Sequence, residues 1–469
     1  MSMIHYISND VLILEHIESL LINDVKLKLS EEAIINVQKC NVFLSQDISE
    51  QFEEKDINNQ YFLLKSYACG IGETISDEVV KLMLFLKIQS LCYGFSGVRL
   101  EIVERLLDFF NNNILPVVYS KNTPDDRIAL AHLSLPLIGE GEVRINGKVF
   151  SACELEAKFG WKPIQLRNKE AEALLGGTQL TTAYGACNLI KALKLCKISD
   201  FISSISVQVF GINSLFFSEQ VQIVRPHKGQ IQTADSIRNL MNSNKLNINK
   251  VVSSSAPEAF CAIPQVHGAV KDTIAHVRKI IKTEINSTTD NLLVFPEKKQ
   301  VIFGGNSHTL PLSLGLDFLS IALTSLGNIS ERRIFYLIST LSTQNNEENL
   351  AMFLNFPVLQ RITEGILAEN KRLSVPVSVE SPIFTEKMTD IKGMGGSSAV
   401  KCYEVIKNIE QILAIELLIV ALIIFNEKSQ YDSEIIKKYI KYLDFDTNKQ
   451  DLKKYIEKTL LFFRENEIV

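Results

Sequence analysis

The stretch that decides the fold is 122-NTPDDRIALAHLSLPLIGEGE-142. It begins with the features of a helix N-terminus, because Thr123 is a good N-cap residue and Pro124 suits the first helical position. Asp125 and Asp126 place negative charge where the helix dipole is positive. The pattern therefore predicts a helix that opens at Asn122 and continues through the apolar residues that follow.

Helical periodicity dominates the rest of the chain as well. The further predicted helices are Ser76–Leu91, Arg99–Asn111, 169–198, 265–289, 311–326, 331–344 and 396–425. One β-hairpin is predicted at Val143–Phe150, where Asn146-Gly147 forms a type I′ turn between alternating apolar and polar residues. The sequence therefore predicts a mainly α fold with a minor β-hairpin.

The most apolar run of the chain lies at 412–425 and is interrupted by Glu416. It is shorter than the roughly 20 apolar residues that a membrane span requires. A helix that is apolar on all sides is typical of a bundle interior or a subunit interface. The first residues lack the pattern of a signal peptide, so we expect a cytoplasmic protein without membrane association.

Composition narrows the function classes. The 469 residues are 46% hydrophobic and 22% charged, which is ordinary for a globular protein with a large core. The net charge of −5 offers no basic surface of the kind that nucleic acids require. The eight cysteines and seven histidines lack the paired spacing of a zinc site or a disulfide framework. We therefore expect neither nucleic-acid binding nor a metal site.

Domain boundaries are only faintly marked in this sequence. Residues 45–59 are polar and acidic, which predicts an exposed loop, and the tail after Asn426 is rich in lysine and tyrosine. We expect an N-terminal helical segment at 1–60, with a shortened inner loop, a helical core at 61–425, and a C-terminal helical tail at 426–469.

Short motifs follow one another along the chain from about residue 60. They are SYACGIG (66–72), GFSGVR (94–99), LAHLSL (130–135), GEGE (139–142), LLGGTQ (174–179), PQVHG (264–268), TDN (289–291), GGNSH (304–308) and SERR (330–333). In this order they resemble the motifs of the histidine and aromatic amino acid ammonia-lyases. The resemblance implies a central bundle of long helices and a homotetramer whose sites combine residues from more than one subunit.

The same resemblance implies that the family's prosthetic group is missing. In that family an Ala-Ser-Gly tripeptide cyclises into an electrophilic methylidene-imidazolone, and the matched positions here hold Thr123, Pro124 and Asp125. None of the three is a serine or a glycine, so the group cannot form by the family's route. We therefore expect no cofactor, and we expect this chain to be a degenerate member of the family.

Other matched active-site positions also differ from the family. The replacements are Gly176 for an asparagine, Glu258 for a tyrosine, Cys261 for an arginine, Ser307 for a phenylalanine and Thr389 for an acidic residue. The family's tyrosine loop has no counterpart before Gln60. Ammonia elimination needs an electrophile for the amine, a base for the β-proton and a cation for the carboxylate. At the matched positions all three are missing.

Several residues remain as candidates for other chemistry. Glu258 is a candidate general base with Tyr67 or His308 as its proton partner, provided that burial makes the carboxylate more basic. Cys261 is a candidate nucleophile if a cation or helix terminus lowers its pKa. The plainer interpretations are a solvated Glu258, a small buried Cys261 and a structural His308. The other predicted pocket residues are Asp126, Gly176, Asn306, Ser307 and Thr389.

The family's helix N-termini, which converge near the prosthetic group, suggest a role for the two aspartates. If this chain keeps that arrangement, Asp125 and Asp126 would neutralise the positive field of the helix dipoles and stabilise the site. Alternatively, the remaining dipoles would still attract a small carboxylate.

Three functions are compatible with these observations. The first is a non-catalytic or ligand-binding homologue related to aromatic amino acid metabolism, binding a small aromatic or carboxylate ligand, alone or in a hetero-oligomer with an active lyase paralogue. The second is a cofactor-free enzyme that uses acid–base chemistry, led by Glu258, on an aromatic acid or its thioester. The third retains histidine or aromatic amino acid ammonia-lyase activity by another route.

Overall fold

The computed structural model describes residues 3–46, 57–121, 126–167, 169–243, 246–247, 256–342, 356–380, 391–426, 430–431, 433–445 and 451–466. The chain divides into two compact units, and each contains separate stretches of sequence. Unit 1 comprises Met1–Ile190, Arg278–Leu316 and Pro376–Val400, and unit 2 comprises Lys191–Val277, Asp317–Val375 and Lys401–Val469. The predicted boundaries near residues 60 and 425 stay predictions.

Unit 1 is built around α4 (Asp77–Cys92), which is buried on every side from Leu82 to its end. The helix begins after Ser76, and its first turn carries Asp77 and Glu78, whose negative charge suits a helix N-terminus. Helices α2 (Glu31–Gln46) and α5 (Leu100–Asn111) pack against it. The helices predicted at Ser76–Leu91 and Arg99–Asn111 are therefore confirmed.

The other helices of unit 1 are short. They are α1 (Leu14–Ile22), α3 (Ile57–Tyr67), α6 (Asp126–Ser134), α7 (Glu154–Phe159) and α8 (Glu170–Leu175). The helix predicted to open at Asn122 is α6, although Asn122–Asp125 lie outside the described residues. Most of the loop predicted at 45–59 also falls outside them, between α2 and α3.

Small sheets complete unit 1. The parallel pair β1 (Met3–Ile7) and β2 (Val25–Leu29) was not anticipated from the sequence. Antiparallel pairs join β3 (Ile71–Thr74) to β5 (Tyr119–Lys121) and β9 (Leu292–Phe295) to β10 (Gln300–Phe303). The predicted hairpin is confirmed as β6 (Glu142–Ile145) and β7 (Lys148–Ser151), with β4 (Ile114–Pro116) as a third strand. Its turn residues Asn146 and Gly147 have φ values of 51° and 78°, as a type I′ turn requires.

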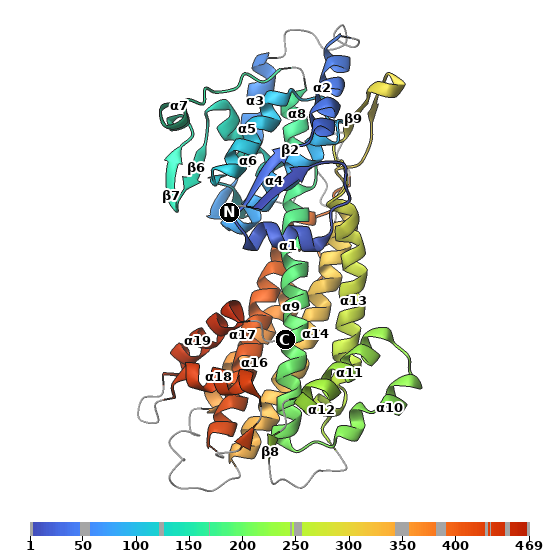
Figure 1. The fold of residues 1–469 in the computed structure, drawn as a ribbon, viewed down its shortest axis with the longest axis vertical. Coiled ribbons are helices and arrows are strands. Elements are labelled where there is room, and N and C mark those ends of the chain that lie inside the picture. The colour runs from blue at the N-terminus through green and yellow to red at the C-terminus, as the bar shows by residue number, and fades with distance from the viewer. Residues whose placement is uncertain are drawn as a thin grey trace. The chain divides into compact units, whose positions relative to one another are not determined.

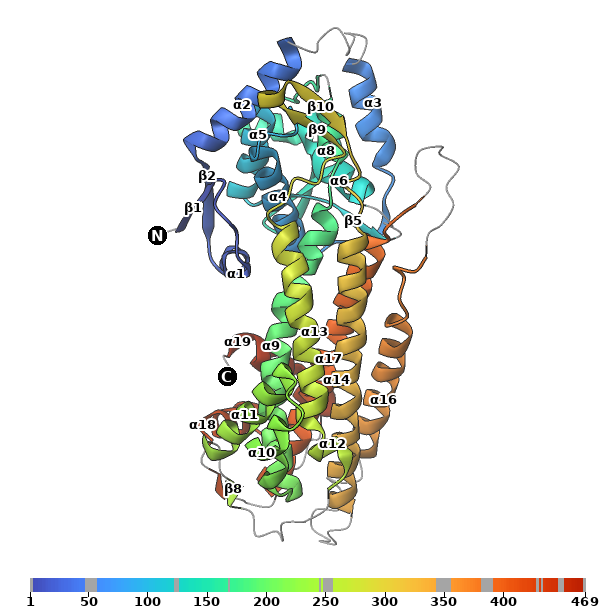
Figure 2. The ribbon, with the colours of Figure 1, turned by 90° about the vertical axis from the view of Figure 1, so that its right-hand side faces the viewer.

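Unit 2 contains a bundle of long helices. Parts of α9 (Gln179–Phe210), α13 (Ile263–Glu284), α14 (Leu310–Ser342) and α17 (Gly395–Asn426) run side by side within it, and α16 (Phe356–Leu373) lies beside α14 (Figures 1 and 2). The shorter elements of this unit are α10 (Glu219–Ile223), α11 (Lys228–Ser243), α12 (Glu258–Cys261), α18 (Glu434–Leu443), α19 (Leu452–Glu465) and the paired strands β8 (Leu246–Asn247) and β11 (Gln430–Tyr431). The expected mainly α fold with long bundled helices is confirmed.

Two helix predictions need correction, and glycine explains both. The helices predicted at 311–326 and 331–344 are one continuous helix, α14. Gly327 does not end it but allows close packing, because a Cβ at this position would lie 2.6 Å from the Cδ1 atom of Ile409 on α17. Conversely, the helix predicted at 169–198 is interrupted at Gly176-Gly177, where Gly177 has a φ of +119°.

The apolar run is buried in α17 from residue 412 to residue 424, as predicted, whereas Phe425 at its end is exposed. Two helices, Leu310–Ser339 and Gly395–Asn426, are long and apolar enough to span a membrane by length and composition, but 61% and 83% of their apolar windows are buried in the fold. Glu416, which interrupts the run, is itself fully buried and pairs with the equally buried Arg333. A bundle interior accounts for this composition.

Candidate functional site

Asp126 lies where several helices of unit 1 begin. Its side chain is 2% exposed, and its carboxylate accepts hydrogen bonds from the backbone nitrogen and the hydroxyl of Thr181, at 2.7 and 2.8 Å. Thr181 belongs to the first turn of α9, so Asp126 caps that helix. Asp126 is also the first residue of α6.

The N-termini of α14 and α17 reach the same place. The backbone nitrogen of Gly395, the first residue of α17, donates a 3.0 Å hydrogen bond to the hydroxyl of Thr309, which directly precedes α14. A Cβ at Gly395 would lie 2.7 Å from the Thr181 hydroxyl and 2.5 Å from the Thr309 Cβ, so only glycine fits. Asp126 thus places its charge among converging helix N-termini, as expected.

A pocket of about 510 Å³ opens beside this convergence, within unit 1. Among its lining residues are Tyr67, Arg127, Lys169, Gly176, Asp290 and Phe303. Tyr67, the last residue of α3, accepts a 3.2 Å hydrogen bond from Arg127, whose guanidinium lies 5.7 Å from the centre of the tyrosine ring. The predicted pocket residues Tyr67 and Gly176 are therefore brought together, and Arg127 directly follows Asp126.

Lys87, a residue of α4, binds the end of α8, and residues at that end line the pocket. Its side chain is fully buried, and its ammonium donates 2.6 Å hydrogen bonds to the carbonyls of Ala173 and Gly176. These carbonyls stand at the end of α8, where a cation is favourable. Burial lowers the pKa of Lys87 to about 8. The sequence analysis missed Lys87 because it lies on an otherwise apolar helix.

Asp290 is the other residue that the sequence analysis missed, although it stands in the TDN motif. It is 2% exposed, yet neither carboxylate oxygen accepts a hydrogen bond from any residue that the structure describes. Lys169 is equally buried and donates its hydrogen bond to the carbonyl of Leu292, at 2.8 Å. Burial lowers the pKa of Lys169, while the nearby charge of Asp290 opposes that shift.

Glu258 and Cys261 belong to unit 2, whereas Tyr67 and His308 belong to unit 1. Glu258 is exposed at the start of α12. The burial that we expected to make its carboxylate more basic is therefore not found. Partial burial raises the pKa of the Cys261 thiol, and the charge of Glu258 adds to this effect. A nucleophilic cysteine needs the opposite shift. The partnership of Glu258 with Tyr67 or His308 stays a prediction.

The GGNSH motif forms the loop before α14. Asn306 and His308 are exposed, and the backbone nitrogen of Ser307 donates a 3.0 Å hydrogen bond to the side chain of Asn291. Asn291 lines the pocket, so this bond ties the loop to the pocket wall. Thr389 lies outside the described residues, as do Thr123, Pro124 and Asp125.

A serine–histidine–aspartate arrangement in unit 2 is structural. The His267 ring lies 2.9 Å from the Asp200 carboxylate through Nδ1 and 3.5 Å from the Ser199 hydroxyl through Nε2. Ser199 and His267 are 0% and 1% exposed, so a substrate cannot reach them. Burial lowers the pKa of His267. Among the described residues no cluster of histidine, cysteine, aspartate or glutamate is suited to hold a metal ion.

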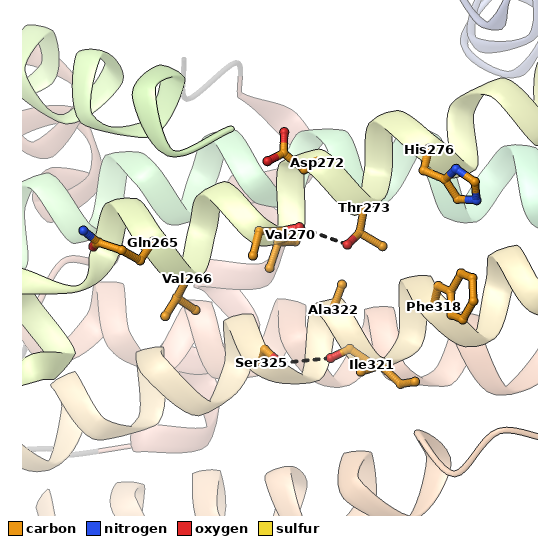
Figure 3. Close-up of a pocket in the computed structure, with 11 residues that line it drawn as sticks. Gln265, Val266, Val270, Asp272, Thr273, His276, Phe318, Ile321, Ala322 and Ser325 are labelled. Atoms are coloured by element: carbon orange, nitrogen blue, oxygen red, sulfur yellow. Dashed lines mark hydrogen bonds between the residues drawn. The ribbon is translucent and has the colours of Figure 1, made fainter. Parts of the chain in front are cut away.

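Figure 3 shows a second pocket, in unit 2, between α13 and α14. It measures about 700 Å³, and none of the predicted site residues lines it. The hydroxyls of Thr273 and Ser325 donate to carbonyls of their own helices, at 2.9 and 3.1 Å. The walls combine apolar side chains such as Phe318 with the polar side chains of Asp272 and His276 (Figure 3). Of these two pockets, the one in unit 1 is lined by predicted site residues, so it is the better candidate for chemistry.

Known proteins share both the motifs and the fold. The family model for aromatic amino acid lyases matches residues 43–443. The histidine ammonia-lyase of Caldanaerobacter subterraneus subsp. tengcongensis is 38% identical over 368 residues, which cover 76% of this chain and 72% of that protein.

Solved structures agree with this relationship. The structure of histidine ammonia-lyase from Trypanosoma cruzi matches with a TM-score of 0.89 at 28% identity, covering 98% of this chain and 93% of that one. Tyrosine aminomutase from Streptomyces globisporus matches with the same TM-score at 26% identity, covering 99% and 97%. By its motifs, its fold and these matches, this chain belongs to the aromatic amino acid lyase family.

Proposed function

We propose that this chain takes part in ammonia-lyase chemistry on a histidine-like or aromatic amino acid. The observation that carries the proposal is the pocket in unit 1, because segments that resemble two of the family's motifs, those around Tyr67 and Gly176, line it. The relatives named histidine ammonia-lyase support elimination of ammonia over a role without catalysis. Arg127 orients the Tyr67 hydroxyl, whose own proton can then be donated to a ligand.

The chain's own residues do not fit the family's prosthetic group. Thr123, Pro124 and Asp125 include neither the serine nor the glycine of the tripeptide, so no step of a reaction is assigned to that group here. We propose instead that the chain holds the amino acid within a mixed tetramer, and that a relative with Ala-Ser-Gly completes the site. Such an assembly would work in the cytoplasm, and the chain alone would form a homotetramer.

The test is an absorbance assay for release of α,β-unsaturated acid from histidine, phenylalanine and tyrosine. We expect no release by the purified chain alone and release by the chain co-expressed with a relative that carries Ala-Ser-Gly. Tyr67→Phe in this chain should slow the pair several-fold, because the pocket loses its oriented hydroxyl. The matched control is Tyr6→Phe, since Tyr6 is 57% exposed and lies outside the pocket.

Two other outcomes would change the account. Release of unsaturated acid by the chain alone would support a self-sufficient lyase and overturn the mixed tetramer. A pair that is insensitive to Tyr67→Phe, together with a chain that binds no amino acid, would overturn the proposal.

The second candidate is a ligand-binding protein without catalysis. The replacements Gly176, Cys261 and Ser307 favour it, because each removes a side chain that the family's motif carries. It predicts that the chain binds an amino acid or its unsaturated acid and that no assembly containing the chain releases product.

A further inference from the structure

The Asp290 carboxylate is the feature of the pocket that its own surroundings do not explain. It is 2% exposed and lines the pocket, and neither oxygen has a hydrogen-bond partner within the described part of the chain. A buried carboxylate without hydrogen bonds is costly, so native structures nearly always satisfy such groups. Because Asp290 lines the pocket, a ligand bound there is a candidate for the missing donor.

Gly176 lies next to this carboxylate and lines the same pocket. A Cβ at Gly176 would lie 3.5 Å from the Oδ1 atom of Asp290, which is ordinary contact distance. The resemblance to the family implies an asparagine at this position, and its side chain would stand beside the carboxylate. Without that side chain, Gly176 contributes only its backbone to the pocket wall. The backbone does not require glycine here, because Gly176 has φ −73° and ψ 144°.

The neighbouring lysines supply charge but no hydrogen bond to Asp290. Lys87 donates to the carbonyls of Ala173 and Gly176, and Lys169 donates to the carbonyl of Leu292. Both lysines lie close enough for the charge of Asp290 to raise their pKa values against the lowering effect of burial. Asp290 is thus a carboxylate acceptor whose lone pairs point to no described donor.

We propose that Asp290 anchors the amino group of an amino acid ligand in the pocket that it lines together with Gly176. The proposal rests on the proposed use of this pocket for an amino acid. The apolar or aromatic body of the ligand would lie against Leu175, Phe303 and the ring of Tyr67, which line the same pocket. This mode of holding nitrogen is non-covalent and needs no prosthetic group.

The test compares two ligands that differ only in the amino group, L-phenylalanine and 3-phenylpropanoate, by calorimetric titration of the full chain. A hydrogen bond to a charged group contributes a factor of roughly 10 to 100 to affinity. Asp290→Asn should therefore weaken the binding of L-phenylalanine by that factor. The affinity for 3-phenylpropanoate should change less than about threefold, within the spread of a neutral change. The pair L-histidine and imidazole propanoate extends the test to an imidazole body.

Gly176→Asn is the second variant. Its side chain would lie beside Asp290 in the pocket and should weaken the binding of L-phenylalanine in the same way. Its Cβ would lie 3.0 Å from the Glu172 carbonyl, so a small local adjustment is expected. The matched control is Gly365→Asn, where a Cβ meets nothing within 4 Å on an exposed helix face. It should bind both ligands as the unchanged chain does.

A stability readout separates a ligand anchor from a structural carboxylate. If Asp290 serves the ligand, Asp290→Asn should leave the melting temperature of the free chain unchanged or raised and should reduce the shift that L-phenylalanine causes. A lowered melting temperature with unchanged binding would make Asp290 a structural partner of the lysines and overturn the proposal. The proposal would also be overturned if the unchanged chain bound L-phenylalanine and 3-phenylpropanoate with equal affinity, or if it bound none of the four ligands. Loss of lyase activity in the mixed tetramer, with binding still dependent on Asp290, would overturn only the proposed function.

Discussion

Arg333 and Glu416 form a fully buried ion pair within unit 2, and both side chains are 0% exposed. Two hydrogen bonds of 2.7 and 2.9 Å join the guanidinium to the carboxylate. The hydroxyls of Ser206 and Ser330 also donate hydrogen bonds to the Glu416 carboxylate, at 2.7 and 2.5 Å. Arg333 and Ser330 belong to the SERR motif, so this motif is structural in the described residues.

Glu416→Gln tests the role of this pair. Removing one partner leaves a buried charge uncompensated, which typically costs about 3–5 kcal/mol of unfolding free energy. Urea unfolding should show this loss for Glu416→Gln and almost none for the control Glu434→Gln, whose side chain is 84% exposed. A loss below about 1 kcal/mol, the scale of a surface pair, would show that the pair does not stabilise the bundle.

Lys87 predicts a pH dependence of stability. Burial lowers its pKa to about 8 from 10.5, so between these values the unfolded chain holds a proton that the folded chain has released. The contribution of Lys87 to the free energy of unfolding therefore rises with pH across this range. The full change is on the order of 3 kcal/mol, at about 1.4 kcal/mol for each pKa unit.

The measurement is the stability of the unchanged chain minus that of Lys87→Met, recorded from pH 7 to pH 10.5. This difference should grow with pH. Lys453→Met is the control, because Lys453 has an 87% exposed side chain, and its difference should stay flat. A Lys87 difference that is flat or falls with pH would show that the folded state does not disfavour the charged ammonium.

At the level of elements, the capping of α9 by Asp126 is the contact that organises the helix N-termini. Asp126→Ala removes the acceptor for the backbone nitrogen and hydroxyl of Thr181, both in the interior. Loss of an N-cap costs about 0.5–2 kcal/mol, and burial places this cap at the upper end. Asp126→Asn should cost less, since it keeps an acceptor and loses only the charge.

Asp451→Ala is the matched control for that prediction. Asp451 caps α19 at an exposed position, accepting a 3.0 Å hydrogen bond from the backbone nitrogen of Lys454. Thermal unfolding should show a smaller shift for this variant than for Asp126→Ala. Equal shifts would contradict the organising role of Asp126.

The sequence predicted the helices and the hairpin well because periodicity and turn chemistry are local. It predicted two helices, at 311–326 and 331–344, where α14 is continuous, because the close approach of Ile409 that Gly327 allows is tertiary. The sequence also predicted that Asp126 would compensate the positive field of helix N-termini, because that expectation needs only the helix dipole. Asp290 was beyond it, because an unsatisfied carboxylate is recognised only when its surroundings are known.

At the scale of the whole molecule, the fold and the family are shown, whereas several residues at the matched active-site positions differ from the family's motifs. Helix N-termini converge at Asp126, and Tyr67, Gly176 and Asp290 line the pocket beside them. We propose that this pocket binds an amino acid without the family's electrophile and that the chain takes part in elimination within a mixed tetramer.

One measurement tests this central claim most directly. The chain, carrying an affinity tag, is co-expressed with an untagged relative that retains Ala-Ser-Gly, and the complex eluted through the tag is assayed for unsaturated acid from histidine and phenylalanine. The account predicts that the relative co-elutes in fixed proportion and that the eluate is active. Elution of the tagged chain by itself, with all activity left in the untagged fraction, would contradict it.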